Sequence, residues 1–156
     1  MAKDAYFFPH DCNARNDPKI LAMRSVYGSA GYGWYWMIIE MFREEESHRL
    51  YLNKYTYDAL AIQMQCDRST VEKYIADCCT EFKNSGSTLL TTDGEFLWSD
   101  AFLRRMKLVD IKREKARESA IIRWKTEHSE NGRKPKVKRS HSEGNAIKER
   151  GEGGGK

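Results

Sequence analysis

The sequence lacks any apolar run approaching the ~20 residues that a membrane-spanning helix requires. Its first residues, MAKDAYFF, also lack the basic flank and apolar segment that begin a secretory signal peptide. These two absences exclude the common membrane-anchored and secreted classes. We therefore expect a soluble, intracellular protein that makes no contact with a membrane.

The sequence has few cysteines, and none of the four stands in a CxxC pair. Adjacent Cys78 and Cys79 on one helix would point about 100° apart, because an α-helix turns through 3.6 residues. That spacing suits neither a zinc knuckle nor a disulfide bond. We expect reduced, mostly buried thiols and no metal ion.

The common catalytic motifs are missing as well. The chain has no GxSxG, GxxxxGK[ST] or HExxH, and no glycine-rich loop between a strand and a helix. His10 and Asp11, followed by Asn13 and Asp17, form the one cluster that resembles a metal or acid–base site, but no second histidine is placed to complete it. We expect a protein that is not an enzyme and that carries no cofactor.

Charge is distributed unevenly along the 156 residues. Residues 1–103 carry 10 basic and 15 acidic side chains, residues 104–128 carry 9 and 4, and residues 129–156 carry 8 and 4. A chain of this length accommodates one core of ordinary size with extensions. We predict a folded acidic domain over residues 1–103, a basic helical extension over 104–128, and a disordered, basic, glycine-rich tail over 129–156.

Two helices are predicted near the N-terminus. The first spans 17–27, with Asn16 and Asp17 as capping residues and a stop at Gly28. The second spans 30–46, because apolar residues recur there at helical spacing. Such a stripe can line a ligand pocket, but without an interrupting polar residue it favours a core. The predicted buried stripe is Trp34, Met37, Ile38, Met41 and Phe42.

The stretch LAIQMQCDRSTVEKYI at 60–75 predicts two short helices joined by a tight turn. An edge strand at RLYL precedes them, and Asn53 can cap the first helix. Asp67 or Ser69 can cap the second, and Ser69 with Glu72 matches a capping box. The first helix buries Tyr57, Leu60, Ala61 and Met64, and the second buries Val71, Ile75, Cys78 and Phe82.

A β-hairpin follows, because Asp93-Gly94 lies between the β-prone runs STLLTT and EFLWS. Helix, turn, helix and hairpin is the order of a winged helix. From residue 100 to about 127 no proline or glycine interrupts a run of helix formers, and Phe102, Leu103, Met106 and Val109 can dock its first turns. The predicted fold is mainly α with a small β-hairpin wing: a winged helix-turn-helix, a long basic helix and a disordered tail.

The second helix of this pair is a candidate for the major groove of DNA. The candidate base contacts are Arg68, Ser69, Thr70 and Lys73. However, segment 67–81 has two basic and four acidic side chains, and duplex binding draws much of its affinity from cations near phosphates. A protein-interaction scaffold is therefore an equally open interpretation of these helices.

The long helix carries more positive charge, with nine basic and three acidic side chains over residues 104–125. It can bind phosphates, or it can be a solvated helix with pairs such as Glu114 and Arg117. The RKPKVKR run at 133–139 adds weak support for a nucleic-acid arm. The candidate phosphate contacts are Arg104, Arg105, Lys112, Arg113, Lys115, Arg117, Arg123 and Lys125.

Several blocks together resemble a known family. They are YFFPHDCNARNDPKI, YGSAGYGWYWMIIEMFREE, YDALAIQMQCD, FLWSDAFLRRM and DIKREKARESAIIRW. Over about residues 5–125 the chain resembles the N-terminal winged-helix domain of phage and prophage replication-initiation proteins, which are replisome organisers of DnaD-like type. The resemblance implies a role in starting phage DNA replication, through origin DNA, self-association or host replication proteins. It implies no catalytic residue, and it makes Phe7 and Phe8 an edge strand while His10 and Asp11 cap backbone groups.

Three hypotheses follow. The first is a DNA-binding replication-initiation protein in the cytoplasm of a bacterial host, associated with the nucleoid, whose wing at 91–95 also touches the duplex. The second is a transcriptional regulator on the same fold, and the third is a protein-interaction adaptor that binds no DNA. Exposed aromatic residues around 32–36 and the second half of the long helix also allow a homo-oligomer.

Overall fold

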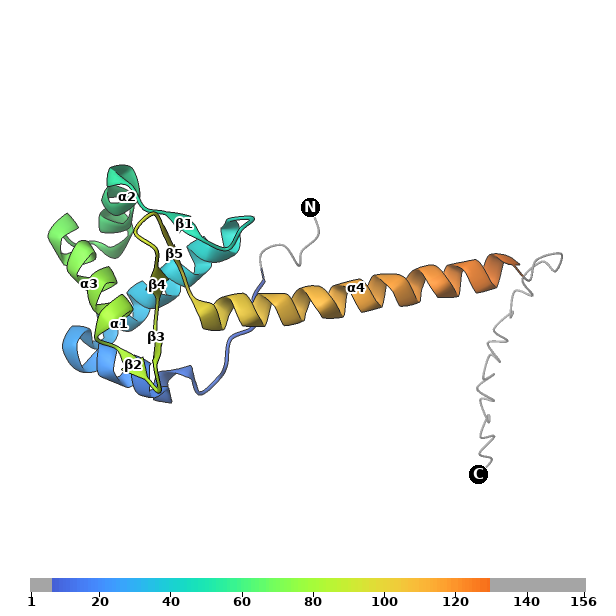
Figure 1. Ribbon diagram of the computed structural model, residues 1–156, viewed down its shortest axis with the longest axis horizontal. Helices are drawn as coiled ribbons and strands as arrows, with labels where there is room; N and C mark the ends of the chain where they lie inside the picture. The colour runs from blue at the N-terminus through green and yellow to red at the C-terminus, as the bar shows by residue number, and fades with distance from the viewer. Residues whose placement is uncertain (1–6, 130–156) are drawn as a thin grey trace, which may run out of the picture. The chain divides into compact units, whose positions relative to one another are not determined.

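The computed structural model describes residues 7–129 (Figure 1). The chain is mainly helical with short antiparallel strands, as the sequence predicts. It divides into two compact units, one ending at Ala116 and one beginning at Arg117. The predicted tail at 129–156 lies outside the described residues except for Ser129, which ends the long helix. The predicted domain boundary after residue 103 stays a prediction. None of the helices within residues 7–129 has the length and apolar character needed to cross a membrane.

Helix α1 spans Pro18–Glu44 and has a kink at Gly28, whose backbone is not helical. Asp17 caps its start, accepting the Lys19 backbone N–H at 2.8 Å. Gly28 has φ 64° and ψ −157°, a left-handed region that glycine enters without a steric penalty. The two predicted helices are thus confirmed as the two halves of α1, although the second half ends at Glu44 rather than at residue 46.

The buried face of α1 differs in part from the predicted stripe. Ile38 and Phe42 are fully buried as predicted. Trp34, Met37 and Met41 are only half-buried, because they lie at the edge of the face that α1 presents to the core. The remaining large buried side chains of this half are Tyr35 and Ile39.

A short 3-10 helix, η2 (Ala14–Asn16), precedes α1. The edge strand predicted at Phe7 and Phe8 is wrong, because residues 7–11 form no strand. Phe8 instead packs its ring against Phe102 with centroids 5.8 Å apart, and the Phe7 carbonyl accepts the Arg43 Nε–H at 2.9 Å. Side-chain packing therefore holds this segment on the domain.

Helices α2 (Lys54–Met64) and α3 (Arg68–Thr80) form the predicted helix-turn-helix. The Asn53 side chain caps α2 by accepting the Thr56 backbone N–H at 2.9 Å. Asp67 caps α3 by accepting the Thr70 backbone N–H at 2.7 Å. The predicted capping box does not form, because the Ser69 hydroxyl donates to the capping carboxylate of Asp67 at 2.8 Å.

The apolar face of α3 is buried as predicted, from Val71 through Ile75 and Cys78 to Phe82. Tyr74 is also fully buried, and its hydroxyl donates to the Gly31 carbonyl of α1 at 2.7 Å. Burial raises the pKa of the Cys78 thiol above its ordinary value. All four cysteines are free thiols. The expectation that they are mostly buried is wrong, because only Cys78 is buried while Cys66 and Cys79 are half-buried and Cys12 is exposed.

A three-stranded antiparallel sheet completes the winged helix. Its order is β1 (Leu50–Tyr51), β5 (Phe96–Trp98) and β4 (Thr91–Thr92), which confirms both the RLYL edge strand and the hairpin. At the tip, Asp93 Oδ1 accepts the backbone N–H groups of Glu95 at 2.9 Å and Phe96 at 2.7 Å. These bonds lower the pKa of Asp93 and fix the wing's turn.

A second hairpin was not predicted. Strands β2 (Lys83–Asn84) and β3 (Ser87–Thr88) pair antiparallel. The turn residues Ser85 and Gly86 have φ of 50° and 80°, the two positive values of a type I′ turn. The Ser-Gly dipeptide in KNSGST was the available signal.

Helix α4 (Asp100–Ser129) is the predicted long helix. Ser99 Oγ accepts the Phe102 backbone N–H at 3.2 Å, which caps its start. Phe102 and Met106 are buried, while Leu103 and Val109 are half-buried. Every residue from Asp110 to Ser129 is exposed. This confirms the prediction that the first turns of α4 dock on the domain.

Candidate nucleic-acid interface

Arg68, the first residue of α3, has its charge opposed by two carboxylates. Its Nε donates to Glu72 Oε1 at 2.8 Å, and its Nη1 lies 3.7 Å from Asp58 Oδ1. The guanidinium also lies 5.9 Å from the centre of the Tyr57 ring. A phosphate that approached Arg68 would compete with both acids, so this candidate contact is weakened by its surroundings.

Ser69 and Thr70 are occupied by the cap of α3. The Ser69 hydroxyl and the Thr70 backbone N–H both donate to Asp67 Oδ1. Hydrogen bonds lower the pKa of Asp67, mainly those from Thr70 and to a smaller extent the one from Ser69. This carboxylate is therefore anionic at neutral pH. An anion at the helix N-terminus already fills the position where a phosphate would bind.

Lys73 is exposed but tethered to the domain. Its Nζ donates to Asp77 Oδ2 at 2.7 Å and lies 3.4 Å from the Tyr27 hydroxyl. Tyr27 in turn donates to Asp77 Oδ2 at 2.5 Å. The hydrogen bonds from Lys73 and Tyr27 lower the pKa of Asp77, and the bond to Asp77 raises the pKa of Lys73. Both predicted cations of α3 are therefore internally neutralised.

The wing offers little positive charge. Between Thr91 and Glu95 the charged residues are Asp93 and Glu95, and both are exposed. The Thr92 hydroxyl donates to the Phe96 carbonyl at 2.8 Å, so it serves the turn itself. The nearby Arg49 guanidinium lies 4.4 Å from the centre of the Trp98 ring.

The cations of α4 within the first unit are arranged differently. Four of them are exposed and form no hydrogen bond or ion pair with residues 7–129. Spacings of 3, 8 and 11 residues from the first place them on one helical face, opposite Phe102 and Met106. These four cations, called the α4 cation face below, are Arg104, Lys107, Lys112 and Lys115.

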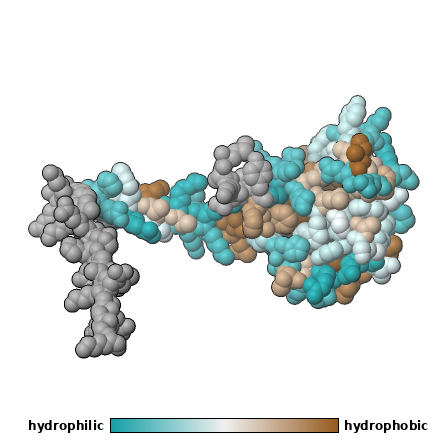
Figure 2. Space-filling view, turned by 180° about the vertical axis from the view of Figure 1, so that it is seen from behind, coloured by the Kyte–Doolittle hydropathy of each residue, from teal (hydrophilic) through white to brown (hydrophobic). Residues whose placement is uncertain are grey.

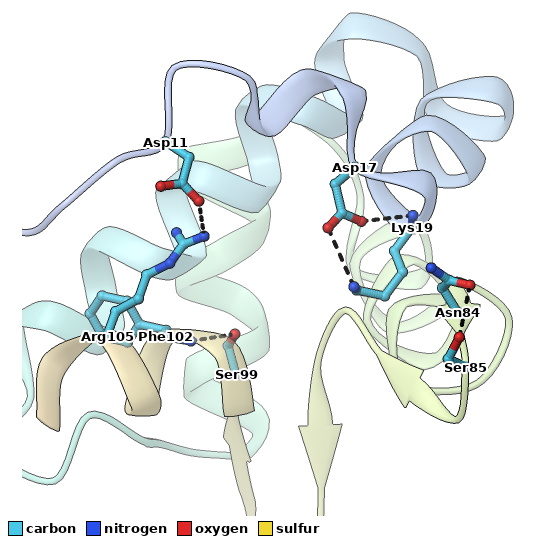
Figure 3. A network of polar contacts seen from close by, with 8 residues as sticks. All are labelled: Asp11, Asp17, Lys19, Asn84, Ser85, Ser99, Phe102 and Arg105. Atoms are coloured by element: carbon cyan, nitrogen blue, oxygen red, sulfur yellow. Dashed lines mark hydrogen bonds and ion pairs between the residues drawn. The ribbon is translucent and has the colours of Figure 1, made fainter. Parts of the chain in front are cut away.

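Lys107 is a member of this face that the sequence analysis missed. Arg113 is exposed on another side of α4. Arg105 is half-buried and is ion-paired with Asp11 of the N-terminal segment (Figure 3). The structure thus brings together three predicted phosphate contacts, Arg104, Lys112 and Lys115, and withdraws Arg105 from them.

Residues 117–129 of the second unit are helical and exposed. They carry the predicted contacts Arg117, Arg123 and Lys125. Large apolar side chains are interspersed, with Ile122 64% and Trp124 60% exposed. Figure 2 shows this mixture as hydrophilic teal interrupted by brown and pale patches along the described part of α4. Basic and aromatic side chains together suit contact with nucleic acid.

The acid–base cluster at the N-terminus has structural contacts. The His10 ring lies 3.9 Å from the Trp36 ring, and the Asp11 carboxylate pairs with Arg105. The prediction that these two side chains cap backbone groups is therefore wrong for Asp11, whose carboxylate reaches α4. Within residues 7–129 no group of three or more His, Cys, Asp and Glu side chains is placed to hold a metal ion.

Comparison with known proteins gives a family. The family model described as Lin1244/Lin1753-like, N-terminal, matches residues 7–102. No curated protein and no solved structure matches the chain. The matched segment runs from the N-terminal packing segment through the winged helix to the start of α4. Because it covers more than half of the chain, this protein belongs to the Lin1244/Lin1753-like family and carries that family's N-terminal domain.

Proposed function

We propose that this chain is a non-catalytic DNA-binding protein that acts in the initiation of phage-type DNA replication. The observation that carries the proposal is the α4 cation face, whose four side chains are exposed and have no partner among residues 7–129. Such cations can replace the condensed counterions of a duplex, which is the main source of sequence-independent affinity. The resemblance to replisome organisers supplies the replication role, at the nucleoid of a bacterial host.

The charges of the winged helix support separate roles for α4 and for the pair α2 and α3. In α3, Arg68 and Lys73 each already contact a carboxylate within 2.8 Å. The charge-neutralised surface of α2 and α3 therefore suits a protein partner better than a phosphate backbone. We propose that α4 binds DNA while α2 and α3 face a replication protein of the host or phage, or a second copy of the chain.

The experiment is a fluorescence-anisotropy titration of the full chain with a labelled duplex of about 30 base pairs, roughly three helical turns. Binding is measured from about 50 to 200 mM salt. The test variant is Lys112→Gln with Lys115→Gln. The matched control is Lys54→Gln with Lys83→Gln, which removes the same charge from exposed positions of the winged helix.

We expect the wild type to bind with a steep salt dependence. The test variant should reduce the slope of log K against log [salt] by about two, because each phosphate contact contributes roughly 0.9. The control should leave the slope within about 0.5 of the wild type. Equal slopes for the two variants, or no binding by the wild type at the lowest salt, would contradict the assignment to α4.

Two alternatives share the fold. A transcriptional regulator predicts that selection from a random duplex pool enriches one short, palindromic sequence. An adaptor without DNA binding is favoured by one observation, the neutralised cations of α3. It predicts a stable complex with a replication protein and no anisotropy change with duplex at physiological salt.

A further inference from the structure

The first unit contains a cavity of about 400 Å³ beside the N-terminal segment. Segment 11–20, the middle of α1, β3 and the start of α4 all contribute to its wall. This volume lies within the range of small-molecule sites, roughly 300–1,000 Å³. Four aromatic rings line it: Phe8, Tyr35, Trp36 and Phe102. All of its lining residues except Arg105 lie inside the family-matched region, and the cavity plays no part in the proposed DNA contacts.

One of the lining residues, Trp36, carries a polar atom without a partner. The Trp36 Nε1–H is buried and makes no hydrogen bond within the described part of the chain. A buried donor left unsatisfied costs about 1–3 kcal/mol, and its N–H reports changes in the packing of this wall. The indole N–H groups of Trp34 and Trp98 do have acceptors: Trp34 donates to the Met64 carbonyl and Trp98 donates to the Asp100 carboxylate.

Two ion pairs stand at the cavity, shown as separate pairs in Figure 3. Arg105 pairs with Asp11, and Lys19 Nζ lies 3.4 Å from Asp17 Oδ2. The carboxylates are accessible, with Asp11 58% and Asp17 39% exposed. Pairs of this kind contribute little to stability, about 0–1 kcal/mol. A ligand that carries its own charges can therefore exchange with either partner.

The sign of the wall selects the ligand. The charges of its two cations and two carboxylates cancel. A polyanion such as a nucleoside triphosphate therefore meets as much repulsion as attraction. Apolar residues Ile20, Ile39 and Leu89 continue the aromatic surface. The site therefore matches a molecule with one negative charge, one positive charge and a large apolar body.

We propose that this cavity binds a free α-amino acid with a large apolar side chain. Its carboxylate accepts from Arg105, its ammonium group donates to Asp17, and its side chain packs on the aromatic rings, Trp36 among them. The proposal is independent of the proposed DNA binding, because none of these residues belongs to the α4 cation face.

The probe is L-phenylalanine, added to the ¹⁵N-labelled full chain. The readout is the indole N–H signal of Trp36, assigned by its absence in Trp36→Phe. We expect this signal to shift and saturate because the Trp36 ring lines the cavity, while the Trp34 and Trp98 signals stay in place because those rings do not line it. Glycine, which lacks the apolar body, serves as the control probe.

Two fragments of the probe separate the charges. 3-Phenylpropionate lacks the ammonium group and 2-phenylethylamine lacks the carboxylate, and each should bind about tenfold more weakly than L-phenylalanine. Arg105→Gln should weaken L-phenylalanine and 3-phenylpropionate but not 2-phenylethylamine. Asp17→Asn should weaken L-phenylalanine and 2-phenylethylamine only. Asparagine also caps helices well, so this variant should remain folded.

The proposal is overturned if the Trp36 signal does not move with L-phenylalanine up to about 10 mM, ten times a millimolar Kd. It is also overturned if glycine shifts the signal equally, or if adenosine monophosphate binds and L-phenylalanine does not. Lys54→Gln, far from the cavity wall in sequence and exposed, controls for a general effect of charge and should bind L-phenylalanine as the wild type does.

Discussion

Gly31 is the residue whose small size matters most to the packing of α1. It is buried, and its carbonyl accepts the hydroxyl of the fully buried Tyr74. A Cβ added there would clash with the Cβ of Tyr27 and lie 2.9 Å from the Met23 sulfur. Gly33, two residues later, would place a Cβ with no atom within 4 Å.

These surroundings predict opposite effects of the same substitution. Gly31→Ala should lower the free energy of unfolding by about 1–3 kcal/mol, because the Cβ of Tyr27 cannot move without its backbone. Gly33→Ala should leave it unchanged or raise it by up to about 1 kcal/mol, since alanine has the higher helix propensity. Urea denaturation followed by circular dichroism measures both. Equal destabilisation by the two alanines would show that helix geometry, rather than packing, decides the effect.

Individual residues show where sequence-based prediction ends. The caps at Asn53 and Asp67 were predicted because a capping side chain acts within three residues of itself. The bond from Tyr74 to Gly31 joins residues 43 positions apart, and no local pattern indicates it. The same holds for Arg105, whose partner Asp11 lies on the N-terminal segment. The site prediction therefore counted charges correctly but could not assign their partners.

At the scale of elements, α1 and α3 are joined by a polar contact as well as by the core. Tyr27 lies just before the break at Gly28, and its hydroxyl donates to Asp77 of α3. Lys73, one turn earlier on α3, donates to the same carboxylate oxygen. This contact holds the first half of α1 against α3 and requires Asp77 to be ionised.

Stability should therefore depend on pH through Asp77. Its pKa is lowered in the folded protein, mainly by Lys73, so its contribution is complete above the unfolded pKa of about 3.9. The contribution is lost as the pH falls through the lower folded value. The difference in unfolding free energy between wild type and Lys73→Gln should thus be largest near pH 7 and shrink below about pH 4.

Carboxyl ¹³C NMR gives the direct check, because the pKa of Asp77 should rise in Lys73→Gln and stay unchanged in Lys54→Gln. A wild-type advantage that persisted unchanged into acid would mean that Lys73 stabilises the fold through something other than its charge.

Elements with a long, regular pattern were predicted well, whereas short ones were predicted only where a turn motif or a β-prone run marked them. The α4 helix and the two halves of α1 have many residues that repeat one period, and the wing has an Asp-Gly turn. The β2–β3 hairpin has two residues per strand, too few for an alternation to be visible. The resemblance implied an edge strand at Phe7 and Phe8, but Phe8 packs against Phe102 and Phe7 is exposed, and neither pairs with a strand.

At the scale of the whole molecule, the family match and the strongest positive charge occupy different parts of the chain. The match ends at residue 102, and all four members of the α4 cation face follow it. The match therefore covers the winged helix and most of the cavity wall, whereas the proposed DNA contacts depend on residues beyond it. Substitutions that weaken DNA binding should accordingly leave the fold intact.

This separation predicts a gradient of amide hydrogen exchange along α4. Phe102 and Met106 are buried, but no residue from Asp110 to Ser129 is, and a helix without tertiary packing is marginally stable in water. Exchange should be slow up to Val109, faster after it, and within about tenfold of an unstructured peptide over residues 117–129. Mass spectrometry of peptides from the exchanged protein measures this gradient.

Added duplex should slow exchange in α4 and leave α3 unchanged, because the cations of α3 are already paired. Uniformly slow exchange to Ser129 without DNA would instead mean that a second copy of the chain covers the exposed half of the helix.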